Sequence, residues 1–366
     1  MARKLKSDKV LFLAALLLLC ASIVMVYSAS FAKALATPEQ QWWLILKQAM
    51  WAALGLAFLG LAMRFDYRHF NQPVVIWTMV VVAVVGLVYV LFGPAVNGAR
   101  RWIGIGNYGV QPSEFAKLAM VVFSAAVLSR RMARINDLTY SLTPLAITGG
   151  VMFYLIAREP DAGGAISLVV IAAVMVFTAG LAWRYLVTAT LALIPLLGAL
   201  LVTSAYRRER LIAFLDPSKD PQGSGYQLLQ SQIAVGTGGV FGRGLAAGIQ
   251  KLHFLPEPHN DFIYAVIAEE LGLVGATAIL ICFVLITWRG LRIAVRAPDA
   301  FGALLAVGIT ALVAVQAFVN ISVVLGLMPT KGIALPLVSA GGSSLLMNTL
   351  AIGILLNISQ HASAEA

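Results

Sequence analysis

Long apolar runs separated by short polar segments dominate the chain. A helix needs about 20 mostly apolar residues to cross the hydrocarbon core of a bilayer. Ten runs fit that length, near residues 10–30, 43–63, 73–93, 112–129, 142–157, 163–181, 184–204, 262–288, 300–325 and 338–359. Pro160, flanked by charged residues, separates the fifth run from the sixth and indicates a turn there. The pattern predicts an all-α polytopic membrane protein of about ten transmembrane helices, forming one domain over residues 1–366.

The composition agrees with that class and excludes others. Of 366 residues, 60% are hydrophobic and only 11% are charged, whereas soluble domains have roughly 45–50% and 25%. Cys20 and Cys282 lie inside apolar runs, so no disulfide framework is expected. The net charge of +10 is spread over several short loops rather than gathered on one polar face, and we therefore expect no nucleic-acid partner.

The basic residues set the expected orientation. Ten spans place both termini on one side, and Lys and Arg accumulate in cytoplasmic loops. The arm of residues 1–9 and the loops that carry Arg64, Arg68, Arg130, Arg131, Arg134, Arg184, Arg289, Arg292 and Arg296 all fall on the same side. We therefore expect cytoplasmic termini. The long polar connection 205–260, between the seventh and eighth spans, then faces outside, and a loop of this length is usually functional.

Charged residues near the outer ends of the helices are the first candidates for chemistry, because ionisable groups near a membrane span are costly to keep. Glu114 and Lys117 are three residues apart, so they share a helix face. They form either a structural ion pair or a positive group lining a cavity. Arg100 and Arg101 either anchor a helix end among headgroups or bind an anion such as a diphosphate, which guanidinium groups match in bidentate fashion.

The turn with Arg158, Glu159 and Asp161 needs no special explanation if it is solvated, but it too lies on the outer side. A glycine-rich stretch over 236–248 lacks the Gly-Lys-Ser/Thr ending of a phosphate-binding loop. Its backbone amides could meet an anion, or the stretch could simply lie on the membrane.

The most specific segment is Lys251-Leu-His-Phe-Leu-Pro-Glu-Pro-His-Asn-Asp-Phe-Ile-Tyr, which leads into Ala268-Glu-Glu-Leu-Gly. It gathers Glu257, His259 and Asp261 where the long loop enters the eighth span. Three readings of Asp261 stay open: a helix N-cap, a metal ligand together with His253 and His259, or a general base whose pKa burial raises.

The chain resembles the SEDS family of shape, elongation, division and sporulation proteins along nearly its whole length. The resemblance is carried by Asn97-Gly-Ala-Arg-Arg-Trp-Ile, Gln111-Pro-Ser-Glu-Phe-Ala-Lys, Glu159-Pro-Asp-Ala-Gly, Gly225-Tyr-Gln, Gln230-Ser, Gly238-Gly-Val-Phe-Gly-Arg-Gly-Leu, Phe254-Leu-Pro-Glu-Pro-His-Asn-Asp-Phe-Ile, Glu269-Glu-Leu-Gly, Pro329-Thr-Lys-Gly-Ile-Ala-Leu-Pro, Ser339 and Gly341-Gly-Ser-Ser. Thr330-Lys331-Gly332 favours the division branch over the elongation branch. Asn260 stands where Thr is usual, and Ala340 where Tyr is usual.

This resemblance implies a peptidoglycan glycosyltransferase that polymerises lipid II at the outer face of the bacterial cytoplasmic membrane, at the division septum. It also implies a class B penicillin-binding protein, the transpeptidase, and other divisome membrane proteins as partners. The family's proposed catalytic aspartate falls on Asp261. The expected substrate-binding set is Arg100, Arg101, Glu114, Lys117, Glu257, His259, Lys331, Ser339 and Ser343. A divalent cation, Mg²⁺ or Mn²⁺, is left open as a cofactor.

The expected chemistry needs few groups. Joining an α-linked sugar diphosphate to a hydroxyl with a β bond is an inversion, for which one carboxylate base suffices when cations stabilise the leaving diphosphate. Two other functions also fit ten spans with buried charges. A lipid II flippase would need polar groups along a path through the bilayer, whereas the candidates here concentrate toward the outer half. A non-catalytic scaffold would not need them at all.

Overall fold

The computed structural model describes residues 7–31, 38–94, 99–105, 108–185, 187–188, 191, 209, 212–223, 225–252, 254–330 and 332–362. Its α-helices are α1 (Lys9–Ala29), α3 (Pro38–Arg64), α4 (Pro73–Leu91), α5 (Pro112–Arg131), α6 (Leu138–Arg158), α7 (Ala162–Thr178), α10 (Tyr226–Gly238), α11 (Ile263–Val295), α12 (Ala300–Val324) and α13 (Gly342–His361). Shorter elements are the 3-10 helices η1 (Tyr67–Asn71), η2 (Met132–Arg134) and η3 (Pro217–Lys219) and the strands β1 (Ile103–Ile105) and β2 (Tyr108–Val110).

The transmembrane prediction is confirmed for the part of the chain that the structure describes. Eight of its helices are long and apolar enough to cross a membrane, and α7 is a shorter apolar helix. Together they account for nine of the ten expected runs. The expected span 184–204 lies almost entirely outside the described residues. The turn predicted at Pro160 is also present, because α6 ends at Arg158 and α7 begins at Ala162.

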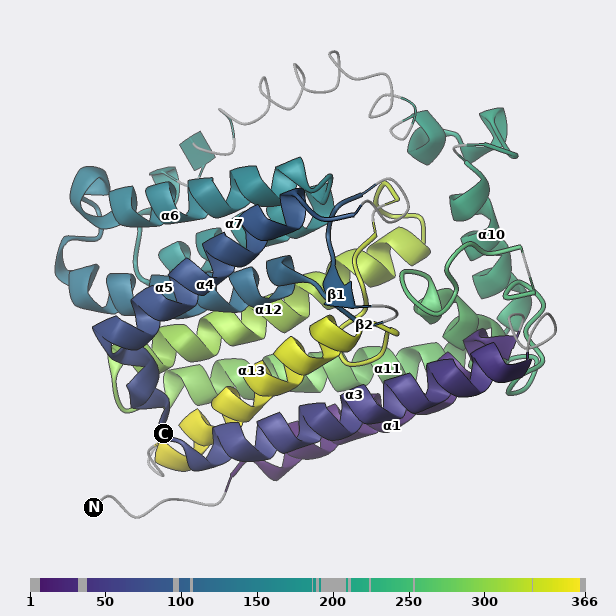
Figure 1. Ribbon diagram of the computed structural model, residues 1–366, viewed down its shortest axis with the longest axis horizontal. Coiled ribbons are helices and arrows are strands. Elements are labelled where there is room, and N and C mark those ends of the chain that lie inside the picture. The colour runs from purple at the N-terminus through teal and green to yellow at the C-terminus, as the bar shows by residue number, and fades with distance from the viewer. Residues whose placement is uncertain are drawn as a thin grey trace.

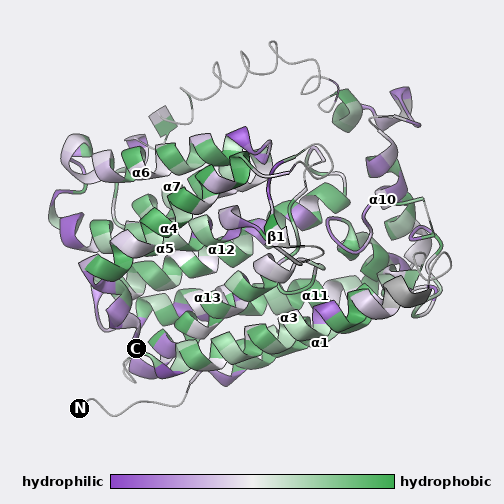
Figure 2. Ribbon diagram, in the orientation of Figure 1, coloured by the Kyte–Doolittle hydropathy of each residue, from purple (hydrophilic) through white to green (hydrophobic). Residues whose placement is uncertain are grey.

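The spanning helices run side by side, with the two ends of the described chain at the same end of the bundle (Figure 1). The backbone N–H of Asp8 donates to Ser359 Oγ at 3.1 Å, which joins the start of α1 to the end of α13. Helix α10 lies at the opposite end of the bundle (Figure 1). Hydrophobic residues cover the lengths of the helices, and hydrophilic ones gather toward their ends (Figure 2). This distribution is the one a bilayer requires of a multi-pass protein.

Helices α5, α12 and α13 form the buried centre of the bundle. Helix α12 packs on α5, α7 and α11, and α13 packs on α3. Small residues allow the close approach: a Cβ added at Gly353 of α13 would lie 2.9 Å from Leu59 Cα of α3. Such contacts replace the hydrophobic driving force that helices lack inside lipid.

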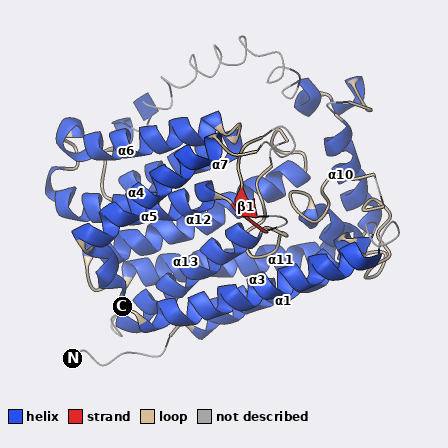
Figure 3. Cartoon of the chain, viewed as in Figure 1, coloured by secondary structure: helices blue, strands red, loops and turns tan. Residues whose placement is uncertain are grey.

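Several local features were not expected from the sequence. Strands β1 and β2 pair antiparallel as a short hairpin between α4 and α5, the red element in Figure 3. Helix α10 occupies part of the predicted long loop. The last helix begins at Gly342 rather than near 338, because residues 332–341 take non-helical conformations there. Helix α11 continues to Val295 and is interrupted at Gly272, whose φ of 65° favours glycine.

A buried ion pair fastens the long loop before α11 at this interruption. Lys251 Nζ lies 2.6 Å from Glu270 Oε1, and both side chains are fully buried. Ser28, near the end of α1, accepts from Lys251 Nζ at 2.8 Å and donates to the Glu270 carboxylate at 2.7 Å. The neighbouring Glu269 accepts the backbone N–H of Ile249 at 2.8 Å. Together, these four residues join the loop to α1 and α11.

Candidate active site

Asp261 lies in the last turn of the long loop, immediately before α11. The N-cap residue of α11 is Phe262, and its side chain makes no cap hydrogen bond. The capping interpretation of Asp261 is therefore wrong, and its carboxylate is not used to begin the helix. The Asp261 backbone is held instead: Asn320 of α12 donates from Nδ2 to the Asp261 carbonyl at 2.8 Å and to the Ile333 carbonyl at 2.7 Å.

Two more hydrogen bonds fix the residues just before Asp261. Ser339 Oγ donates to the Asn260 carbonyl at 2.6 Å and accepts the Leu335 N–H at 2.8 Å. The Ala340 N–H donates to the His259 carbonyl at 2.9 Å. The segment 332–341 therefore holds Asp261 in place through its backbone. These bonds occupy the Ser339 hydroxyl, and its expected contact with substrate stays a prediction.

The Asp261 carboxylate lies in a confined, charged environment. A Cβ added at Gly332 would lie 2.8 Å from Asp261 Oδ2, so only glycine leaves this space open. Burial raises the pKa of Asp261 to about 6, the negative charges of Glu257 and Asp161 add to the shift, and the Arg101 guanidinium opposes it. Asp261 lies outside the spanning helices. Its carboxylate is thus ionised at neutral pH and more basic than an ordinary aspartate.

Glu257 and His259 lie beside one another on the approach to Asp261. Glu257 Oε2 is 3.4 Å from His259 Nε2 and accepts from Asn260 Nδ2 at 3.1 Å. Half of the Glu257 side chain is exposed, whereas that of His259 is buried. The structure therefore brings both predicted residues to the site, with Glu257 at its open side.

The facing wall is the turn between α6 and α7. Asp161 caps α7 by accepting the Gly164 N–H at 2.9 Å, and Gln111 Nε2 lies 3.4 Å from its other oxygen. Arg101 donates from Nε to the Glu159 carbonyl at 3.0 Å and from Nη2 to the Pro160 carbonyl. Arg101 thus holds the turn while its positive charge acts on Asp261.

Glu159 is the unexpected member of this wall. Its side chain is 0% exposed. Glu159 is therefore not solvated, although the sequence allowed a solvated turn. Neither of its carboxyl oxygens has a hydrogen-bond partner among the described residues. Burial raises the pKa of Glu159 to about 8, with a further contribution from the Asp161 charge and an opposing one from Arg101. Glu159 is therefore mainly protonated at neutral pH.

We expect a Glu159→Gln variant to differ from the wild type in the pH dependence of its stability. The folded protein binds a proton at Glu159 that the unfolded chain releases above about pH 4.5, so the wild type loses stability as pH rises from there through about 8. Gln has no such proton. Melting temperatures measured in detergent should show the variant gaining on the wild type between pH 5 and 8.5. All other ionisable groups are common to the two chains, and a difference that is constant with pH would contradict the protonated state.

The remaining predicted residues are Glu114, Lys117, Arg100, Ser343 and Lys331. Lys117 Nζ pairs with Glu114 Oε1 at 2.8 Å in the first turns of α5, and their side chains are 3% and 12% exposed. Arg100 donates to the Leu91 carbonyl at 2.9 Å. Ser343 is buried, and its hydroxyl has no hydrogen-bond partner in the part of the chain that the structure describes. Lys331 lies outside the described residues.

The metal hypothesis gains no support from the described residues. They contain no group of three or more His, Cys, Asp or Glu side chains placed to hold a metal ion. His253, one of the three proposed ligands, lies outside them. A divalent cation therefore stays a prediction of the sequence.

Comparison with known proteins identifies the scaffold that carries this site. The model of the cell cycle proteins FtsW, RodA and SpoVE matches residues 8–364. The chain belongs to this family. It is 40% identical to the probable peptidoglycan glycosyltransferase FtsW of Geobacter sulfurreducens, over 96% of this chain and 95% of that one. It is also 40% identical to the stage V sporulation protein E of Bacillus subtilis, over 98% and 99% of the two chains.

Solved structures of FtsW/RodA/SpoVE proteins have the same fold. A chain from a study of structural coordination of polymerization and crosslinking by a peptidoglycan synthase complex superposes with a TM-score of 0.79 at 30% identity, covering 96% of this chain and 97% of that one. The rod shape determining protein RodA of Thermus thermophilus superposes with a TM-score of 0.71 at 26% identity, covering 98% of each chain.

Sequence reasoning missed one contributor to this family member's site and the role of another. Asn320 sits inside an apolar span with no neighbouring charge, and its polar side chain in that span was the only signal. Asp161 was noticed, but only the fold shows that its charge acts on Asp261. Contacts between residues so distant in sequence follow from helix packing, which a single sequence does not display.

Proposed function

We propose that this protein is a peptidoglycan glycosyltransferase that polymerises lipid II into glycan strands. One observation carries the proposal: a confined carboxylate, Asp261, held through its backbone beside Arg101, in a chain that matches glycosyltransferases of this name over nearly its full length. A base at the outer end of a membrane bundle suits a lipid-linked sugar substrate, since the reacting sugar lies at the surface and the lipid tail among the helices.

Asp261 acts as the general base. Its carboxylate accepts the proton of the acceptor sugar hydroxyl, the hydroxyl oxygen forms a bond to the anomeric carbon of the donor, and the bond from that carbon to the diphosphate breaks. The proton stays on Asp261 and the bonding electrons leave with the diphosphate. The raised pKa of Asp261 helps, because a more basic carboxylate is a better proton acceptor while it is still ionised at neutral pH.

Cationic side chains stabilise the departing diphosphate. Arg101 is the nearest assigned one, since its charge already acts on Asp261. Arg100, Lys117 and Lys331 are the further members of this set. Positive groups fixed in place before the reaction stabilise the charge that develops on the leaving oxygen without reorganisation.

The proposed setting is the bacterial cytoplasmic membrane with both termini inside. The described ends of the chain share one end of the bundle, and the arginine-rich loops lie there as well. Asp261 then faces outside. We place the protein at the division septum with a class B penicillin-binding protein as its partner, since one solved relative comes from a complex that couples polymerization to crosslinking.

The test is polymerisation of purified lipid II in liposomes by the purified protein with its cognate transpeptidase. Long glycan strands support the proposal. An intact complex that forms no polymer, yet moves lipid II between leaflets in a parallel translocation assay, would replace it with a flippase. An intact complex that does neither would leave the scaffold function.

The polymerisation rate should depend on the ionisation of Asp261. Protonation removes the base, so we expect the rate to fall below about pH 6 and to approach a tenfold loss for each further unit. Initial rates at lipid II concentrations well below KM, measured from pH 5 to pH 8, give kcat/KM and thus report the pKa of the free enzyme. A flat profile from pH 7 down to pH 5 would contradict the assignment of Asp261 as the base. Recovery of the initial rate when the protein returns from pH 5 to pH 7 excludes acid denaturation as the cause of the loss.

A further inference from the structure

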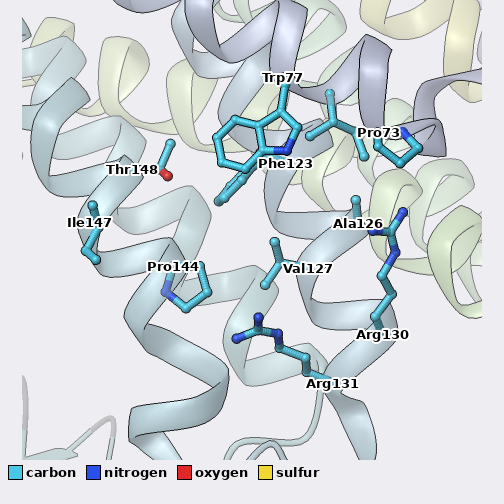
Figure 4. Close-up of a pocket in the computed structure, with 11 residues that line it drawn as sticks. Pro73, Trp77, Phe123, Ala126, Val127, Arg130, Arg131, Pro144, Ile147 and Thr148 are labelled. Carbon is cyan, nitrogen blue, oxygen red and sulfur yellow. The ribbon is translucent and has the colours of Figure 1, made fainter.

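A cavity at the end of the bundle that holds both termini has no part in the proposed reaction. It lies between α4, α5 and α6, with a volume of about 350 Å³ (Figure 4). Arg130, in the last turn of α5, lines it and donates to the Asn71 carbonyl at 2.9 Å. Asn71 belongs to the same short helix as Tyr67, whose ring packs on His361 near the chain's end. The cavity is therefore far from Asp261.

The cavity is an apolar groove that opens on the outside of the bundle. Phe123 and Val127 form its floor, and the Trp77 ring packs edge-on against Phe123 at 5.8 Å. Trp77 and Ile147 line it while being 57% and 63% exposed. In a membrane protein this exterior faces lipid tails, so the natural content of the groove is an acyl chain. Its volume is at the low end for ligand pockets, about 300–1,000 Å³.

Two arginines stand at the mouth of this groove, and the fold positions one of them through a proline. Pro144 in α6 has no N–H, which removes the helical hydrogen bond to the Tyr140 carbonyl one turn earlier. Arg131 Nη1 donates to that carbonyl instead. Its guanidinium also lies over the Tyr140 ring, 4.5 Å from the centroid. In Figure 4 the two side chains point apart: Arg130 extends beside Ala126, and Arg131 lies below Val127.

The charge at the mouth is complementary to an anion. None of the ion pairs among the described residues involves Arg130 or Arg131. The acid nearest in sequence, Asp137, caps α6 and accepts the Tyr140 N–H at 3.2 Å. Guanidinium groups bind phosphate oxygens in bidentate fashion. Basic pockets between helices at the cytoplasmic side are a known way to bind anionic headgroups.

We propose that this groove binds an anionic phospholipid, with one acyl chain between α4 and α6 and the phosphate on Arg130 and Arg131. With the proposed orientation the lipid comes from the cytoplasmic leaflet. The site is separate from lipid II polymerisation, and its binding test does not depend on that activity.

The experiment is native mass spectrometry of the full chain in detergent, titrated with phosphatidylglycerol or with phosphatidylcholine of the same acyl chains. We expect a bound phosphatidylglycerol that phosphatidylcholine does not match. An Arg130→Gln and Arg131→Gln double variant should weaken its binding about tenfold or more, because hydrogen bonds to charged groups contribute strongly.

Two further variants make the result specific. Arg292→Gln removes one guanidinium charge from an exposed position at the end of α11, outside the groove. This variant should bind phosphatidylglycerol as the wild type does. Thr148→Trp fills the groove and should displace the lipid with both arginines intact. Equal binding of the two lipids, or equal losses in the Arg292 and double variants, would overturn the proposal. A monodisperse gel-filtration peak confirms that each variant is folded.

Discussion

Replacing Asp261 by Asn is expected to reduce glycan polymerisation by about 10²–10⁴-fold, the usual contribution of a general base. Asn has nearly the same shape, and the hydrogen bond from Asn320 goes to the Asp261 backbone carbonyl, so the local structure should persist. The amide cannot accept the hydroxyl proton. The measurement is the initial rate of strand formation from purified lipid II by the complex with its transpeptidase.

Asp137→Asn is the matched control for this loss. It makes the same chemical change at the start of α6, near the other end of the bundle. Asn serves as a helix cap about as well as Asp, so both stability and polymerisation should stay close to wild type. Polymerisation by Asp261→Asn within a few-fold of the control would show that another group takes the proton.

Replacing Glu270 by Ala should cost about 3–5 kcal/mol of the free energy of unfolding, the usual penalty for breaking a buried ion pair. The variant leaves the Lys251 ammonium buried, with the Ser28 hydroxyl as its remaining hydrogen-bond partner. It also removes the acceptor of the Ala246 N–H, which donates to Glu270 Oε2 at 3.0 Å. Denaturant unfolding in a mild detergent, followed by circular dichroism, measures the difference.

A double variant separates the loss of the pair from the loss of packing. Lys251→Met with Glu270→Met replaces both charges by apolar side chains of similar length, and such replacements are often neutral. We expect it to recover most of the stability that Glu270→Ala loses. If the double variant is as unstable as the single one, the uncompensated Lys251 charge is not the cause.

Hydropathy alone predicted the spanning helices because the bilayer imposes one length and one composition on them. The turn at Pro160 was predictable for a similar local reason, since proline cannot continue a helix. The hairpin of β1 and β2 and helix α10 were not predicted. They are short and have no apolar periodicity that distinguishes them from a loop.

The candidate site was predictable in its parts and not in its arrangement. Asp261, Glu257 and His259 share one sequence segment, so they could be grouped before the fold was known. Arg101 and Asp161 come from two other segments, and only the fold brings their charges close enough to act on Asp261. Burial also reverses the expectation for Glu159, since exposure cannot be read from a turn whose neighbours in space are unknown.

The single side-chain amide of Asn320 links two separate loops to each other mechanically. By donating to the carbonyls of both Asp261 and Ile333, it ties two separate loops to one point on α12. A displacement of α12 therefore moves Asp261 and the segment 332–341 together. The turn at Asp161 precedes α7 and faces Asp261 from the other side of the site. A displacement of α12 relative to α7 therefore changes the distance between Asp261 and that turn, with no contact to the reacting sugars.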